Sequence, residues 1–134
     1  MIIREQRITI VRIRKPAKPD MNSELQWFGN ALGLFNLRDK DKSQFRLFIE
    51  LLKAAKNKTP ISSDGLAYKL GLTRGTVVHH LNKLMEAGIV VPTQKGYLLR
   101  VSNLSELIDE IERDIKEACT DLREIAKDID ERLT

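Results

Sequence analysis

Apolar and polar residues alternate near the N-terminus, and helical spacing replaces this pattern further along the chain. Residues 2–15 are predicted to form a strand, because alternate side chains project to opposite faces. In this segment Ile8, Ile10 and Arg12 alternate with Thr9, Val11 and Ile13. The polar side is basic. Two prolines between residues 15 and 20 then fix φ and remove backbone donors, so this stretch is predicted to be a linker.

Two helices are predicted to follow the linker. An accessory helix within residues 21–37 begins at a cap, Asn22 or Ser23, and its apolar positions follow helical spacing. These positions are Leu25, Phe28, Leu32 and Phe35. A charged turn at residues 38–42 separates it from a helix that runs from Ser43 to about Lys56. The inward positions of this second helix are Phe45, Phe48, Ile49 and Leu52.

Residues 61–101 carry the pattern of a helix-turn-helix followed by a hairpin. Ser62 or Ser63 caps a short helix that ends at Leu70, and Gly71 follows where a helix end favours a left-handed residue. Thr73 caps a longer helix to about Ala87. Strands are expected at residues 89–91 and 97–101, joined by a turn at residues 93–96. The fold class is therefore mainly α with a small β-hairpin wing.

A long C-terminal helix is predicted from the capping box of Asn103 and Glu106. Its apolar residues recur at alternating spacings of four and three, a coiled-coil repeat. They are Leu104, Ile108, Ile111, Ile115, Ala118, Leu122, Ile125 and Ile129. Asp114, Asp121 and Asp128 flank this seam with no basic residues opposite. We therefore expect a dimer in which the accessory helix also packs, rather than a simple two-stranded coiled coil; whether the helices run parallel or antiparallel stays open.

Residues 61–90 resemble the winged helix-turn-helix of ArsR/MarR-type regulators, and most resemble the archaeal members. The resemblance rests on Leu66-Ala67, Gly71-Leu72-Thr73, Thr76-Val77, His80-Leu81 and Leu84 followed by Gly88-Ile89-Val90. It covers about forty of the 134 residues. Gly65 departs from the pattern, since the family commonly has Glu there. The resemblance implies a dimeric transcriptional regulator that binds double-stranded DNA.

The outward face of the second helix of this motif fits the DNA major groove. With Val77, Leu81 and Leu84 buried, helical geometry turns a polar set outward. This set is Arg74, Gly75, Thr76, Val78, His79 and Lys83. Arg74 can pair with guanine, and Thr76 and His79 can hydrogen-bond to bases. Gly75 allows close backbone approach, and Lys83 suits a phosphate.

Further contacts are predicted at helix N-termini and at the wing. Ser62, Ser63 and Thr73 lie where free backbone N–H groups suit phosphate oxygens, although helix capping alone explains these residues equally well. Lys95 at the wing tip can reach a phosphate or the minor groove, or can be an ordinary solvated lysine. His80 is expected to be a half-buried packing residue.

Charge divides the chain more sharply than the overall value of +4 indicates. Residues 38–100 contain twelve Lys/Arg against five Asp/Glu, whereas residues 101–134 contain five against eleven. The N-terminal 20 residues are also basic. A basic middle suggests a polyanionic partner. For the basic N-terminal segment four roles stay open: pairing with the wing sheet, contact with a partner subunit, DNA binding, or a disordered arm.

Several classes of protein are disfavoured. The sequence lacks a signal-peptide pattern and an apolar run of membrane-spanning length, so no membrane partner is expected. The single Cys119 excludes an intramolecular disulfide and a multi-cysteine metal site. No phosphate-binding glycine loop or nucleophile–base pair indicates an enzyme. We therefore expect neither a cofactor nor a metal, and whether a small-molecule effector binds is undetermined.

These patterns predict four regions and one function. The regions are a basic strand and linker (1–20), an accessory helix (21–37), a winged helix-turn-helix domain (38–101) and a dimerisation helix (102–134). The predicted function is a cytoplasmic, nucleoid-associated homodimer that regulates transcription from a pseudo-palindromic DNA site. The alternative is a winged helix that binds protein or RNA in a larger assembly, since fold does not fix function.

Overall fold

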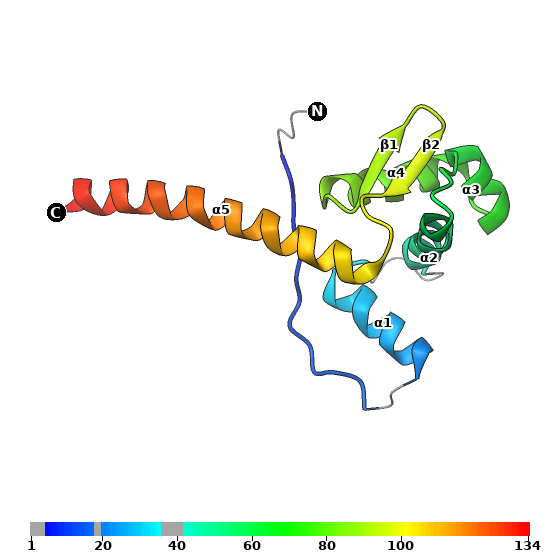
Figure 1. The fold of residues 1–134 in the computed structure, drawn as a ribbon, viewed down its shortest axis with the longest axis horizontal. Helices are drawn as coiled ribbons and strands as arrows, with labels where there is room; N and C mark the ends of the chain where they lie inside the picture. The colour runs from blue at the N-terminus through cyan, green and yellow to red at the C-terminus, as the bar shows by residue number, and fades with distance from the viewer. Residues whose placement is uncertain (1–4, 18–19, 36–41) are drawn as a thin grey trace.

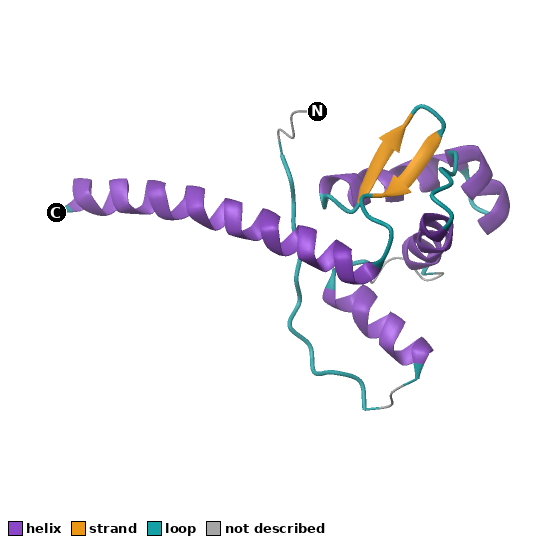
Figure 2. Ribbon diagram, in the orientation of Figure 1, coloured by secondary structure: helices purple, strands orange, loops and turns teal. Residues whose placement is uncertain are grey.

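The chain folds into a small helical domain from which one long helix projects (Figure 1). The computed structural model describes residues 5–17, 20–35 and 42–134. The elements are α1 (Met21–Ala31), α2 (Ser43–Lys56), α3 (Ser63–Leu70), α4 (Arg74–Glu86), β1 (Val90–Thr93), β2 (Gly96–Leu99) and α5 (Leu104–Leu133). Figure 2 shows helices and one antiparallel hairpin. The predicted fold class, mainly α with a hairpin wing, is confirmed. Most of the charged turn at residues 38–42 lies outside the described residues.

The core of the domain lies where α2, α3, α4 and the hairpin meet. Each helix contributes one apolar face, as the spacing of its residues requires. The most deeply buried side chains are Leu47, Phe48, Leu51, Leu66, Val77, Leu81, Leu84, Ile89 and Leu107. This core is aliphatic apart from Phe48. It packs α4 against α2, α3 and β1, which fixes the direction of the outward face of α4.

The helix-turn-helix begins and turns where its local chemistry requires. The Ser62 hydroxyl accepts a hydrogen bond from the Gly65 N–H at 3.0 Å and so caps α3. Gly71 follows α3 with φ of 66°, a left-handed conformation that side chains disfavour. The Thr73 hydroxyl accepts from the Thr76 N–H at 3.2 Å and caps α4. Both caps satisfy backbone donors that a helix leaves free at its start.

The hairpin pairs Val90 with Leu99 and Thr93 with Gly96. Its outer edge on the β2 side is occupied as well, because Ile61 and Tyr97 exchange backbone hydrogen bonds of 3.1 and 2.8 Å. The connection from α2 to α3 is thereby tied to the wing. A further strand cannot pair at that position.

The accessory helix α1 is shorter than the predicted 21–37 region. Asp20, not Asn22 or Ser23, caps it: the Asp20 carboxylate accepts from the Ser23 N–H at 2.8 Å and the Ser23 hydroxyl at 3.0 Å. At the other end, the Leu34 N–H donates to the Gly29 carbonyl at 2.8 Å. This bond satisfies a terminal carbonyl and turns the chain back toward the domain. The turn carries Phe35 onto Phe45, with 4.7 Å between their ring centroids.

The predicted N-terminal strand is wrong for the residues that the structure describes. Residues 5–16, which we name the arm, contain no β-strand. The backbone N–H groups of Arg7 and Val11 instead donate to the carbonyls of Glu86 and Ala31, at 2.8 and 2.7 Å. The arm thus binds the C-terminal ends of two helices, whose last carbonyls have no partner within the helix. It passes across α5 on its way to α1 (Figure 1).

The long helix α5 has two unlike halves. Its first turns pack on the domain, with Leu107 and Ile111 buried. Arg100 fastens this half: it hydrogen-bonds both carboxylate oxygens of Asp114 and also Glu110, and Gln6 of the arm donates to Asp114 at 2.9 Å. From Lys116 to Thr134 every residue is exposed. The distal half therefore has no packing partner among the described residues.

Candidate nucleic-acid interface

Helix α4 has a buried side and a polar side. Val77, Leu81 and Leu84 are fully buried in the core, and His80 is 7% exposed beside them. The His80 imidazole lies 2.7 Å from the Ser43 hydroxyl at the start of α2. This hydrogen bond makes His80 a residue that joins two helices. It cannot reach DNA from this position.

The remaining positions of α4 lie on the surface, where the structure places most of the residues predicted to contact DNA. Exposed residues of the predicted set are Ser62, Thr73, Arg74, Gly75, His79, Lys83 and Lys95. Half-buried residues of the set are Ser63, Thr76 and Val78. The α3 N-terminus and the first two turns of α4 belong to adjacent helices of one motif, whereas Lys95 lies apart in the turn of the wing. Contact of these residues with DNA stays a prediction.

Arg74 is the first residue of α4, and it lies beside an acid. Its Nε lies 3.6 Å from the Asp64 carboxylate in the first turn of α3, and both side chains are about three-quarters exposed. Such a pair contributes little to stability. It does hold the Arg74 guanidinium beside the first turn of α3. Asp64 would have to release Arg74 for a bidentate contact with a base.

Gly75 leaves an open place at the start of α4. No heavy atom lies within 4 Å of the position that a Cβ would take there. The exposed backbone is therefore accessible to a large partner. Thr76 behind it is held by the hydroxyl of Thr73, at 2.9 Å between the two oxygens. That contact fixes the orientation of the side chain predicted to face a base.

Tyr68 is a candidate contact that the sequence analysis did not single out. It lies on α3 and is 93% exposed, the largest exposure among the large hydrophobic residues described. Leu66 and Leu70 point into the core, so helical geometry puts Tyr68 on the opposite side. The spacing of those two leucines was sufficient to predict that Tyr68 is exposed. A phenol hydroxyl there can donate to a phosphate.

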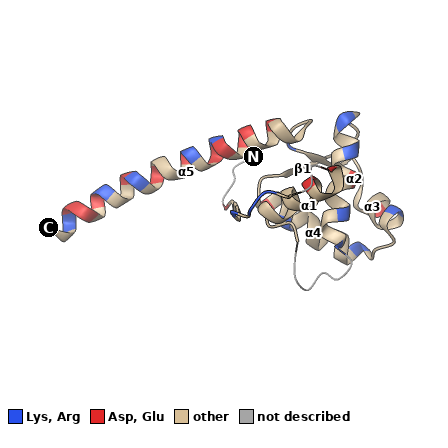
Figure 3. Ribbon diagram, turned by 90° about the horizontal axis from the view of Figure 1, so that it is seen from below, with Lys and Arg blue, Asp and Glu red and all other residues tan. Residues whose placement is uncertain are grey.

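Positive charge gathers on the domain, whereas α5 carries both signs along its length (Figure 3). Lys69 is partly neutralised by Glu50, whose carboxylate lies 3.0 Å away, and the Lys69 hydrogen bond lowers the pKa of Glu50 below its ordinary value. Lys83 and Lys95 have no salt bridge among the described residues. Both are available to a polyanion.

Within the described residues, no three His, Cys, Asp or Glu side chains group in a way that would hold a metal ion. None of the described helices combines the length and the apolar character needed to cross a membrane. The single cysteine, Cys119, is an exposed thiol on α5.

Comparison with known families identifies the motif. Residues 50–91 match the model of the family described as bacterial regulatory protein, arsR family. The match begins inside α2, contains α3 and α4, and ends in β1. Residues 50–91 are thus similar to the helix-turn-helix of this family of transcriptional regulators, as the resemblance in the sequence indicated. No curated protein shows a significant match to the chain.

The residues predicted to form a dimer interface fall into three groups. Phe28, Leu32 and Ile115 are partly buried against the core of their own chain, and Ile111 is buried almost completely, which leaves little of it for a second copy. Leu25 is half-buried on α1. The exposed group comprises Ile108, Ala118, Leu122, Ile125 and Ile129. A second copy can therefore reach only part of the predicted seam.

Proposed function

We propose that the protein is a sequence-specific transcriptional regulator that binds a pseudo-palindromic DNA site as a homodimer. One observation carries the DNA-binding part. Helix α4 is anchored by three fully buried residues and presents Arg74, Gly75 and His79 on its exposed side. A rigid helix with donors at its N-terminal end is what the major groove admits. The protein acts on DNA as a regulator, not as an enzyme, in the cytoplasm at the nucleoid.

The residues of the motif divide the work of binding. Arg74 pairs with O6 and N7 of a guanine after leaving Asp64, and Thr76 and His79 contact neighbouring base edges. Backbone N–H groups at the starts of α3 and α4 orient the domain on phosphates. Lys83 and Lys95 add phosphate contacts on either side. This arrangement gives both specificity and a strong dependence on salt.

Homodimerisation is supported by the apolar stripe of α5. Leu122, Ile125 and Ile129 are between 50 and 69% exposed in the single chain, an exposure that soluble monomers seldom show in a row. A two-fold partner would cover them. It would also present two α4 helices to successive turns of the major groove, about 34–36 Å apart. The operator would then share the symmetry of the protein.

The test is selection of DNA by the purified protein from random duplexes, followed by titration at several salt concentrations. The wild type should select a palindromic motif, with an affinity that falls steeply as salt rises. The double variant Arg74→Ala/His79→Ala should lose selectivity and about tenfold or more in specific affinity, since a bidentate contact discriminates by about 1–3 kcal/mol.

Lys127→Ala is the matched control, because Lys127 is an exposed cation far along α5. It should leave the selected motif unchanged. Absence of DNA binding at low salt, or weak binding that the double variant does not alter, would reject DNA recognition by α4 and would favour a protein or RNA partner.

A further inference from the structure

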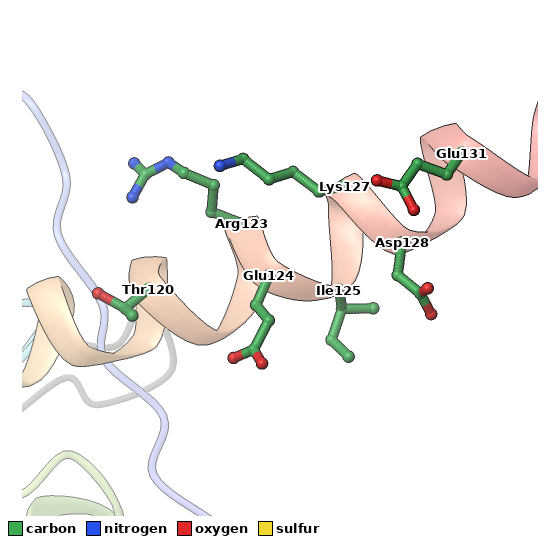
Figure 4. A pocket seen from close by; sticks show the side chains of 7 residues that line it. All are labelled: Thr120, Arg123, Glu124, Ile125, Lys127, Asp128 and Glu131. Atoms are coloured by element: carbon green, nitrogen blue, oxygen red, sulfur yellow. The ribbon is translucent and has the colours of Figure 1, made fainter.

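Two exposed apolar surfaces lie at opposite ends of α5. The distal surface consists of Leu122, Ile125, Ile129 and Leu133, which are 50 to 81% exposed. Figure 4 shows part of this stretch, with Ile125 of the distal surface drawn among the side chains that line a neighbouring hollow. Ile125 points to one side of the helix together with Glu124 and Asp128. The open hollow there, about 590 Å³, is lined by side chains of α5 alone.

The second surface is a groove at the base of α5. It has a volume of about 640 Å³ and lies between the end of the arm, α1 and the first turns of α5. Its apolar lining includes Leu25, Trp27, Phe28, Leu104 and Ile108, with Lys15 at the margin. The indole N–H of Trp27 donates to the Ile13 carbonyl at 3.3 Å and so ties the arm to α1. The groove is therefore formed by three separate segments of the chain.

The arm, whose end borders the groove, carries further exposed apolar side chains. Ile10, Val11 and Ile13 are 53, 46 and 41% exposed, although the Val11 N–H is bonded to the end of α1. A segment held in place by backbone bonds, with apolar side chains left in solvent, has the features of one half of an interface. Its backbone is already ordered, which reduces the entropic cost of binding.

We infer that the groove and the arm of one copy receive the distal half of α5 of a second copy, with the two α5 helices antiparallel. This inference rests on the homodimer in the proposed function and specifies its geometry. The apolar residues of the groove lie near Leu104 and Ile108, and the uncovered stripe is centred near Ile129. A two-fold partner covers both surfaces at once only when the helices run in opposite directions. They then cross near Ala118, where a small side chain permits close approach.

The sides of α5 indicate where the partner helix lies. The Asp114 side is closed by Arg100 and Gln6 of the same chain. The open side begins at Ser105 and Ile108 in the groove and continues through Cys119 and Ala126, whose small side chains widen the apolar face. A partner helix on this side lies away from Asp114, Asp121 and Asp128. These aspartates flank the 3.5-residue repeat, and for that reason the sequence did not favour a simple two-stranded coiled coil.

Charge supports the same arrangement. Arg12, Arg14 and Lys15 of the arm have no salt bridge among the described residues. In the same set of residues, Asp121, Glu124 and Glu131 of distal α5 are likewise unpaired. The antiparallel arrangement brings the basic arm of one copy to the distal half of α5 of the other, where six Asp/Glu outnumber four Lys/Arg over residues 116–134. A small apolar ligand in the groove is a poorer explanation, because it would leave the distal surface and these charges uncovered.

The geometry is tested by cross-linking at chosen sites. In a Cys119→Ser background, Ser105→Cys and Thr134→Cys place thiols in the groove and at the tip of α5. Along one helix these sites are about 43 Å apart, so no reagent of short reach joins them within a chain. With a flexible bis-maleimide, the chain that carries both cysteines should form covalent dimers. The chains that carry one cysteine should remain monomers on a denaturing gel.

Each other result would overturn the inference. Cross-linking of the Thr134→Cys chain alone would show parallel helices, and that of the Ser105→Cys chain alone would show base-to-base contact. A protein that sediments as a dimer without any cross-link would place the interface elsewhere. In these three cases the homodimer itself stands. Sedimentation as a monomer at all concentrations would reject the homodimer too, and binding of an apolar dye to the groove of that monomer would identify a small-molecule site instead.

The contribution of the arm is measured with Ile10→Glu. Since Ile10 is half exposed, the variant should fold, with thermal unfolding at low concentration as the check. It should raise the dimer dissociation constant at least tenfold. Tyr68→Glu makes the same kind of change at an exposed site on α3 and should leave the dimer constant unchanged. An unaltered dimer in Ile10→Glu would remove the arm from the interface.

Discussion

The winged domain and the distal half of α5 are both helical, yet they use their apolar residues differently. In the domain, Leu47, Leu66 and Leu81 are completely buried, and polar residues face solvent. In distal α5, Leu122 and Ile129 are half exposed or more, and nothing in the described chain covers them. The first region gains its stability within one chain. The second has no packing partner among the residues that the structure describes, and isolated helices are marginal in water, so a partner molecule would stabilise it.

The sharpest way to separate the two regions is the same substitution in each. Leu81→Ala should lower the free energy of unfolding by about 2–5 kcal/mol, through lost burial and the cavity left behind. Leu122→Ala removes a leucine that is 69% exposed and should hardly change unfolding of the single chain. Denaturant unfolding at low and high protein concentration measures both. A large loss for Leu122→Ala at low concentration would show that distal α5 is packed within its own chain.

Removing the distal region altogether should affect DNA affinity more than folding. A chain that ends at Lys116 keeps Leu107, Ile111 and the Arg100–Asp114 contacts, so its domain should still unfold cooperatively. Without pairing, affinity for a palindromic site should fall by about 10² or more, since avidity is lost. Titration of full and half operators is the measurement. Equal affinity of the two chains for the full operator would argue against a dimer on DNA.

Substitutions at two glycines of the domain should change its stability by smaller amounts and in opposite directions. A Cβ at Gly96 would lie 2.5 Å from the Ile61 carbonyl oxygen, and φ there is 141°. Gly96→Ala should therefore destabilise the protein by about 1–3 kcal/mol. Gly75 has no neighbour within 4 Å, and Gly75→Ala should stabilise α4 by up to about 1 kcal/mol while weakening DNA binding. Thermal unfolding and DNA titration compare them, and opposite signs in stability are expected.

The smallest effect concerns the junction between the two regions. The hydrogen bond from Arg100 lowers the pKa of Asp114 below its ordinary value of 3.8, aided by the bond from Gln6. The stabilisation is therefore complete above that ordinary value and is lost as pH falls through the lowered pKa of the folded state. Asp114→Asn should cost about 1 kcal/mol at pH 7 and flatten this acid-side decline. Asp121→Asn, one heptad later and exposed, should do neither when unfolding is followed from pH 7 to pH 2.

Local chemistry made much of the winged domain predictable. Ser62, Thr73 and Asn103 each accept a hydrogen bond from the backbone three residues later, as caps do regardless of the rest of the fold. At α1 the sequence predicted Asn22 or Ser23 as the cap and assigned Asp20 to the linker, but Asp20 caps the helix because its carboxylate accepts two hydrogen bonds from Ser23. Sequence cannot rank such neighbours when each has the right chemistry.

Long-range contacts were less predictable. The alternation in the arm indicated an extended segment, but a strand also needs an available edge, and Ile61 already occupies the edge at Tyr97. The burial of Leu107 was not predicted, because Leu107 lies outside the 3.5-residue repeat. That repeat describes packing against one partner, whereas the base of α5 packs on the domain with one side and lines the groove with another. At the candidate DNA interface, Tyr68 could have been found from helical spacing. The Arg74–Asp64 pair could not, since it joins different helices.

The length of α5 has a consequence for the operator. A helix of 30 residues spans about 45 Å. In an antiparallel pair, this length would set the distance between the two winged domains. Seven residues inserted at the crossing would keep the apolar stripe in phase and move the domains apart by about 10 Å. That distance equals about three base pairs of DNA. In the proposed dimer, the length of α5 would therefore set the spacing between half-sites.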